Sequence, residues 1–484
     1  MDKATAEREA IRLWRNLPVQ DRLTRQQAVA FAAMIAPTLE FDEPARRTRL
    51  IEGWLIKDLL QTEAAAAITR REATEALAVP GWPQREGASA IAFVLAILIM
   101  IARRPDIITN AMLWAEDGPI YFAQAYNEGW WTTLLRPVAG TLQLFPRLIF
   151  EAATLLPLRL VPLFGVWAAL VVRAALPAFM FSSRFSFMDW RAKVAISAYY
   201  LLMPNLADVH ANVTNTHWYV FLYLLLVLFA DAPRNLAWRV HDWIVLILGG
   251  LTGPMIVFAL PVLGFRLAAQ RGGLSARWAF AGGAAALALL QGVMLVLSGH
   301  GSPGGGTLMA LAQDLGARVF VGFLSPLRWV PALSNPMVAV PVTAVGLAIT
   351  AATLWRGGWR ARSLAVLPIL IPAAAIWTPI LAPEAVSWAA RANFDEPGYF
   401  VVAALAWTGT LVSFAAIFLP RFSNATLAVL ALLGGFLILF DFALPQVAGA
   451  SFGPQADRFA QAQTGETVAI PTSPPGWSME LIKR

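Results

Sequence analysis

The stretch SAIAFVLAILIMIARR (89–104) carries one hydroxyl group and no charge before its last two residues. A helix that crosses the hydrocarbon core of a bilayer needs about 20 mostly apolar residues, since each residue adds about 1.5 Å. Runs of similar or greater length recur through the chain and predict an all-α fold, a polytopic transmembrane bundle of about 9–11 membrane segments. We expect spans at 89–104, 157–181, 192–208, 217–230, 277–298, 336–355, 364–381, 398–419 and 424–443.

The composition supports this fold class. Of 484 residues, 58% are hydrophobic and only 14% are charged, and the mean hydropathy is +0.59. A soluble protein of this length would expose too much apolar surface. The absence of cysteine excludes disulfides and thiolate metal sites. The net charge of +7 is typical of basic loops beside a membrane, so we do not expect nucleic-acid binding.

One apolar stretch, 242–268, is too short for two full crossings and is interrupted by GGLTGP (249–254). Its two ends fall on the same predicted side of the membrane. We therefore expect two short half-helices that enter and return. Such broken backbone is tolerated at membrane depth only where protein or water covers it.

The first 87 residues differ from the rest because they carry 13 basic and 13 acidic residues. Leu50, Ile51, Trp54, Leu55 and Leu59 recur at helical spacing, which indicates an amphipathic helix. We expect a small helical domain with a linker over 1–87, a transmembrane domain over 88–445 and a tail over 446–484.

The distribution of Lys and Arg predicts the orientation. Five short loops (182–193, 231–241, 266–277, 355–363 and 420–423) hold 12 basic residues, and the alternate loops hold five in far more chain. Because basic loops stay cytoplasmic, we expect the N-terminus inside and the C-terminus outside. The long external loops are then 105–156, 299–335 and 382–397. Arg103 and Arg104 break the rule, and we expect them to reach lipid phosphates.

An acidic pair, Glu116 and Asp117, lies in the first of these external loops with Arg136 and Arg147. Guanidinium groups suit phosphate binding, and carboxylates suit proton transfer or a divalent cation. The alternative is an interfacial helix whose aromatic residues lie among the headgroups and whose charges are solvated.

Two further external clusters are polar. The turn NLADVHANVTNTHWY (205–219) contains His210, Asn212, Asn215 and His217, which either cap the turn or line a site, and the two imidazoles are possible metal ligands. The loop 381–400 contains Arg391 and Tyr399, and its alternative interpretation is a solvated loop.

The motifs WAEDGPIYFAQA (114–125), RPVAGTLQLFPRL (136–148), NVTNTHW (212–218), GLTGP (250–254) and IPTSPPGW (470–477) together resemble the GT-C superfamily of integral-membrane glycosyltransferases. More narrowly, they resemble a related bacterial membrane family. The resemblance covers roughly 100–480.

The resemblance implies a function in the bacterial cytoplasmic (inner) membrane. The donor would be a polyprenyl-phosphate sugar, and the acceptor a cell-envelope glycan or lipid on the external face. The family's acid corresponds to Asp117, with Glu116 beside it. The late external region, with Arg391 and Tyr399, would hold the donor phosphate or the acceptor, although the Arg that precedes the Tyr in related proteins is missing here.

This chemistry needs one base. A lipid phosphate is already a good leaving group, so a carboxylate has only to remove the proton from the acceptor hydroxyl as it attacks, with inversion. We predict Asp117 as that base and Glu116 as the neighbour that raises its pKa. Arg residues, with a divalent cation (Mg or Mn) on the two carboxylates if one is needed, would offset the charge on the leaving phosphate.

Two other functions stay open. The GLTGP break favours a transporter or flippase for a lipid-linked saccharide, because such breaks line transporter sites. A non-catalytic scaffold, in which residues 1–87 bind a cytoplasmic protein, would best explain the N-terminal domain.

Overall fold

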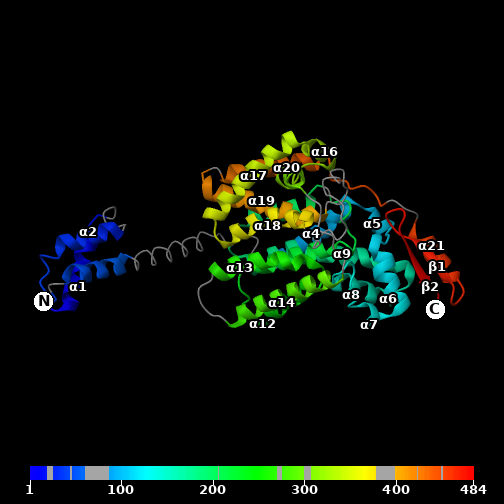
Figure 1. Cartoon of the computed structure of the whole chain (residues 1–484), viewed down its shortest axis with the longest axis horizontal. Helices are drawn as coiled ribbons and strands as arrows, with labels where there is room; N and C mark the ends of the chain where they lie inside the picture. Colours follow the sequence, from blue (N-terminus) through cyan, green and yellow to red (C-terminus); the bar gives the residue numbers. More distant parts are fainter. Residues whose placement is uncertain are drawn as a thin grey trace. The chain divides into compact units, whose positions relative to one another are not determined.

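The computed structural model describes residues 1–18, 25–43, 46–59, 87–204, 206–269, 275–298, 307–377, 398–421, 423–447 and 451–484. The chain divides into two compact units, residues 1–82 and 83–484. Both consist mainly of helices in their described parts, and one two-stranded sheet lies near the C-terminus (Figure 1).

The N-terminal unit contains α1 (Lys3–Arg15), α2 (Arg25–Ile35) and a helix over 47–59. Its core is small: the rings of Trp14 and Phe31 lie 5.5 Å apart, and Ile51 and Leu55 of the last helix are fully buried. Ile51 and Leu55 belong to the apolar face of the amphipathic helix that their spacing in the sequence predicts. Lys3, Arg8, Arg12 and Arg15 cover the outer face of α1, as expected of an amphipathic helix that packs on a core.

Within the described residues of the second unit, four helices are long and apolar enough to cross a membrane. They cover Leu158–Met180, Trp278–Leu297, Pro336–Arg356 and Phe400–Phe418. The helices of this bundle are α4 (Ala88–Arg103), α9 (Val161–Met180), α10 (Trp190–Leu202), α11 (Thr216–Phe229), α12 (Leu236–Gly250), α13 (Ala259–Ala269), α14 (Ser275–Leu297), α15 (Leu308–Asp314), α16 (Val330–Leu333), α17 (Pro336–Arg356), α18 (Trp359–Trp377), α19 (Gly398–Phe418) and α20 (Ser423–Ile438). The four candidate spans fit a membrane protein.

Helix α11 lies at the centre of the bundle and contacts α8 (Leu144–Ala153), α9, α12, α13 and α19. Eleven of its 14 residues are buried, which agrees with a sequence that is apolar on every face. Its last carbonyl groups cannot reach water. They accept hydrogen bonds from Arg266 of α13 (2.6 Å to the Leu228 oxygen) and from Arg360 of α18 (3.0 Å to the Phe229 oxygen). Cations at a helix C-terminus also suit its dipole.

The break between α12 and α13 is filled by protein. Residues 142–145 run beside it: the Leu144 N–H donates to the Leu251 oxygen (2.8 Å), and the Gly253 N–H donates to the Leu142 oxygen (2.7 Å). Gln291 of α14 also donates to the Gly250 oxygen (3.1 Å). The RPVAGTLQLFPRL and GLTGP motifs therefore form one structure, in which each satisfies the other's backbone.

Arg103 does not reach outward, so the expectation that it contacts lipid phosphates is wrong. The residue is 1% exposed, and its guanidinium donates to the carbonyl oxygens of Leu201, Met203, Asp441 and Phe442 at 2.8–3.2 Å. These carbonyls lie in the last turn of α10 or just beyond the ends of α10 and α20, where helices leave acceptors without partners. Arg104 is also buried and donates to the Ala207 oxygen (2.8 Å).

A second core lies beside the bundle, in a part of the unit that we name the cap. The cap consists of α5 (Asp106–Thr109), α6 (Ala123–Glu128), α7 (Trp130–Thr133), α8 (Leu144–Ala153), α21 (Phe452–Gln461), β1 (Thr467–Pro471) and β2 (Ser478–Ile482), with the turns between them. The red C-terminal elements lie next to the cyan helix α6 in Figure 1, and β2 contacts α6.

The C-terminal residues differ from the expected tail. The strands β1 and β2 pair antiparallel, with Ile470 opposite Met479. Both side chains are fully buried and pack in one cluster with Phe122 and Phe150. Alternate residues along each strand face this core, as the period of two in a β-strand requires. Each strand has only five residues, so this alternation is a weak sequence signal compared with that of the long apolar helices.

Replacement of Arg103 by Met should destabilise the second unit by about 2–4 kcal/mol, because buried carbonyl groups lose a charged donor. Thermal unfolding of the purified chain in detergent measures this. Arg159→Met is the control, since that side chain is 69% exposed. Equal melting temperatures for the two variants would contradict the assigned role of Arg103.

Candidate functional site

The backbone around the acidic pair is irregular. Ala115 has φ of +42°, residues Ala115–Asp117 form a 3-10 turn, and Gly118–Phe122 form a π-helical turn. A left-handed non-glycine residue is costly and persists only where its surroundings hold it. Strained backbone and π-helical turns concentrate at functional sites, which favours this segment as one.

The C-terminal hairpin helps to hold this segment. The Ala115 N–H donates to the Ser473 oxygen (2.5 Å), and the Ser473 N–H donates to the Leu113 oxygen (2.8 Å). Gly118 permits the close approach, because a Cβ there would lie 2.6 Å from Cγ2 of Thr472. The WAEDG and IPTSPPGW motifs, more than 350 residues apart in sequence, are thus in contact.

Asp117 is 2% exposed, and hydrogen bonds occupy both of its carboxylate oxygens. Oδ1 accepts from the N–H (2.7 Å) and the hydroxyl (2.8 Å) of Thr214, and Oδ2 accepts from the Val213 N–H (3.2 Å). Burial raises the pKa of Asp117 to about 7, and the hydrogen bonds from Thr214 and Val213 oppose that rise. The carboxylate holds the turn that precedes α11, at the end where the helix dipole favours a negative charge.

Glu116 has a different environment. It is half-buried, and among the described residues no backbone N–H of the 213–214 turn donates to it, since those of Val213 and Thr214 donate to Asp117. Burial raises the pKa of Glu116, and interactions with its own backbone and the Thr214 side chain oppose the increase. A partly accessible carboxylate with a raised pKa can exchange a proton, whereas one that is surrounded by donors serves to position. The two adjacent carboxylates therefore lie in different environments: Asp117 is buried and held by the 213–214 turn, and Glu116 is partly accessible.

His217 lies in the first turn of α11 and is half-buried. Its Nδ1 lies 2.8 Å from the Thr214 oxygen, which can only accept, so we assign the proton to Nδ1. Nε2 then carries a lone pair, and within the described residues it has no hydrogen-bond partner. Thr214 thus contacts the acidic pair with its side chain and N–H, and orients His217 with its carbonyl group.

The other polar residues of the 205–219 turn stabilise the turn itself. Asn212 and Asn215 both donate to the Asp208 oxygen, at 2.5 and 3.0 Å. His210 lies 3.0 Å from Nη1 of Arg173 and 3.0 Å from the Met100 oxygen, so both ring nitrogens are engaged. Burial and the neighbouring Arg173 hold the pKa of His210 well below its usual value. His210 is therefore a structural residue with no nitrogen available for a metal.

The two arginines predicted to bind phosphate have protein partners. Arg147 is 1% exposed and donates to the Ile120 oxygen and to Gln124, both at 2.9 Å. Arg136 forms a salt bridge with Glu128 at the surface of the cap. Arg391 lies outside the described residues, as does the side chain of Tyr399, whose backbone begins α19.

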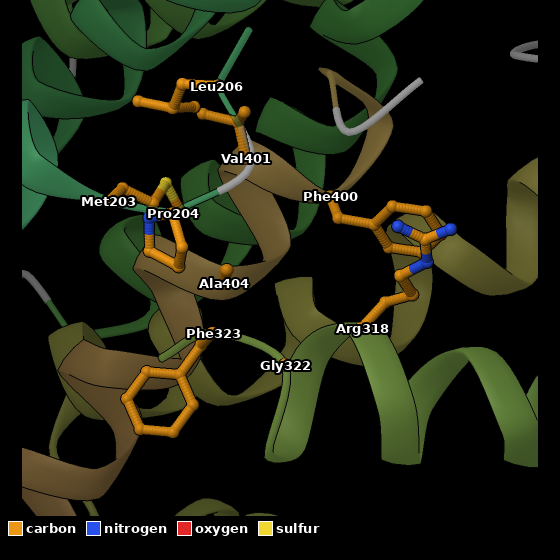
Figure 2. Close-up of a pocket in the computed structure, with 9 residues that line it drawn as sticks. All are labelled: Met203, Pro204, Leu206, Arg318, Gly322, Phe323, Phe400, Val401 and Ala404. Carbon is orange, nitrogen blue, oxygen red and sulfur yellow. The ribbon is translucent and has the colours of Figure 1, made fainter. Parts of the chain in front are cut away.

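Figure 2 shows a small cavity where α19 begins. The Arg318 guanidinium lies over the Phe400 ring, 5.6 Å from its centroid, and Met203 and Leu206 form the facing wall. The cavity has about 20 Å³, enough for a single water and too little for a sugar. Sequence reasoning missed Thr214, Ser473 and Arg318, because no local pattern shows what a side chain meets across the fold.

Replacement of Asp117 by Asn should loosen the turn before α11, because an amide nitrogen would face a backbone donor. We expect a loss of about 1.5–3 kcal/mol, typical of a hydrogen bond to a charged group. Hydrogen exchange of the Val213 and Thr214 amides should accelerate. Asp457→Asn is the control, with a side chain that is 58% exposed; unchanged exchange in the Asp117 variant would refute its positioning role.

Replacement of Gly118 by Ala should lower the melting temperature and weaken the contact with the hairpin, since the added Cβ would overlap Thr472. Limited proteolysis of residues 462–484 reports on that contact. Gly292→Ala is the matched control, because its Cβ would meet nothing within 4 Å. A hairpin equally resistant to protease in both variants would show that Gly118 is not required for docking.

Comparison with known proteins provides no relative from which a role could be transferred. No family model matches this chain, and no curated protein or solved structure matches it. Among the described residues, no group of three or more His, Asp and Glu lies close enough to hold a metal ion.

Proposed function

We propose that this chain is a polytopic integral-membrane glycosyltransferase of the GT-C type. It transfers a sugar from a polyprenyl-phosphate donor to a hydroxyl group of a cell-envelope glycan or lipid, on the external face of the bacterial cytoplasmic membrane. The observation that carries the proposal is Glu116, a half-buried carboxylate with a raised pKa on strained backbone beside an apolar bundle. In this proposal the cap is external and the N-terminus is cytoplasmic.

The reaction assigns a role to each group. Glu116 removes the proton from the acceptor hydroxyl as its oxygen attacks C1, the bond from C1 to the phosphate oxygen breaks, and the configuration inverts. Asp117, first predicted to be the base, positions Glu116 through Thr214. Nε2 of His217 accepts a hydrogen bond from a sugar hydroxyl. The lipid phosphate leaves as an anion and needs no acid.

The described residues do not fit a resident divalent cation. Both oxygens of Asp117 accept hydrogen bonds from the 213–214 turn, so Glu116 is the one accessible carboxylate of the pair. Glu116 would therefore be a single protein ligand, and among the described residues no group of three or more His, Asp and Glu lies close enough to hold a metal ion. No step is therefore derived through such an ion.

The flippase alternative has less support, because the GLTGP break packs against residues 142–145 and Gln291. The N-terminal unit keeps a separate role in the proposal, as a module that binds a cytoplasmic protein. Met34 and Val29 of α2 are 62% and 41% exposed and offer an apolar surface for such a partner.

Replacement of Glu116 by Gln should lower sugar transfer by about 10²–10⁴-fold, the usual contribution of a general base. Transfer from a radiolabelled polyprenyl-phosphate sugar in membranes measures it. Melting temperature and the exchange of the Val213 amide should not change. Glu128→Gln, a surface acid in the same segment, should keep its activity.

The pH profile provides an independent check. The base must be ionised, so kcat/KM should rise with pH through the pKa of Glu116, which burial places above the ordinary 4.5. The acidic limb should vanish in Glu116→Gln. Full activity in that variant would exclude this assignment.

A further inference from the structure

Arginines cluster at the end of the bundle where α17 passes into α18. Arg356, Arg360 and Arg362 fall within seven residues, interleaved with Trp355 and Trp359, and Arg421 follows the adjacent end of α19. Residues 336–377 and 398–421 contain no Asp or Glu. This end of the helices therefore carries an excess of positive charge.

A groove of about 360 Å³ opens between the start of α18 and the end of α19. Trp359, Arg360, Ser413 and Ala416 are among the residues that line it. The groove lies at the ends of two candidate membrane spans, α17 and α19. Tryptophan and arginine side chains at span ends occupy the headgroup layer of a bilayer, with acyl chains along the helices below.

Arg360, which lines the groove, and Arg356, which ends α17 beside it, retain hydrogen-bond donors. Arg360 donates from Nε to the Phe229 oxygen and from Nη2 to Asp231 (3.3 Å), so Nη1 has no hydrogen-bond partner within the described residues. The Arg360 guanidinium lies 3.7 Å from the centroid of the Phe187 ring, and this contact restricts its motion. Arg356 is exposed and stacks on Trp355 (4.8 Å) without a hydrogen bond to the described protein.

The apolar surroundings indicate a lipid rather than a soluble anion. Trp355 and Val345 of α17 are 71% and 61% exposed, so apolar surface continues away from the arginines along the helix. Ala416 and Ile417 provide a small, apolar wall on α19. Such a site offers acyl chains a surface and offers one phosphate several donors.

We propose that this groove binds the headgroup of an anionic phospholipid, with the phosphate at Arg356 and Arg360 and an acyl chain along α17. Basic pockets between membrane helices bind anionic headgroups by this combination of charge and apolar contact. The proposal does not depend on the glycosyltransferase function, since none of these residues belongs to the site at Glu116.

The test measures the melting temperature of the purified full chain in neutral detergent as lipid is added, because a ligand of the native state raises it. Phosphatidylglycerol should raise it in a saturable manner, and phosphatidylcholine and inorganic phosphate should not. Arg356→Gln should weaken the apparent affinity roughly fivefold, as expected for one cation at the headgroup. Ala416→Phe fills the groove, keeps every charge and should abolish the shift.

Arg239→Gln is the matched control, since Arg239 is an exposed arginine on α12 outside the groove, and this variant should bind like the wild type. An equal shift with phosphatidylcholine would overturn the headgroup selectivity. An equal shift with inorganic phosphate would show a soluble-anion site instead. If Arg356→Gln and Ala416→Phe both kept the full rise in melting temperature with phosphatidylglycerol, the proposed lipid site would be refuted.

Discussion

The carboxylate of Asp117 accepts hydrogen bonds from Thr214 and Val213, at the point where the chain turns into the buried helix α11. A helix surrounded by protein cannot leave its end groups to water, so other segments must satisfy them. Asp117 provides acceptors near the N-terminus, and Arg266 and Arg360 provide donors at the C-terminus. Both charges also suit the helix dipole. The bundle is organised around a helix that depends on three distant side chains.

The same interaction joins the cap to the bundle. Asp117 lies in the segment that pairs with Ser473, so the C-terminal hairpin, the acidic pair and the start of α11 form one connected structure. The 136–148 segment joins it through its pairing with residues 251–253. Motifs scattered over more than 350 residues therefore converge where an apolar bundle meets a polar cap. In the proposed function, this junction is the place where the lipid-linked donor meets the polar acceptor.

Buried arginines provide much of this connectivity. Arg103, Arg147 and Arg173 are each at most 1% exposed, and none forms a salt bridge with a carboxylate within the described residues. Arg103 and Arg147 donate to carbonyl groups, and Arg173 lies over the Tyr219 ring and beside His210. A guanidinium has five donors in a planar fork, which lets one side chain satisfy several helix ends. That geometry explains why Arg103 occupies a position at which the distribution of Lys and Arg among the loops predicts no basic residue.

The sequence by itself determined the class of fold and the segment that carries the candidate site. Long apolar runs leave few alternatives to helices that suit a membrane, and two adjacent acids after such a run are chemically conspicuous. The same pattern could not distinguish Glu116 from Asp117, since their local sequence is shared. It also could not show that His210 and Arg147 are structural, or that residues 467–482 form a hairpin. Those outcomes depend on which distant backbone groups each side chain meets and on how far it is removed from water. Tertiary packing alone sets both, because hydrogen-bond partners and desolvation arise from residues far apart in the chain.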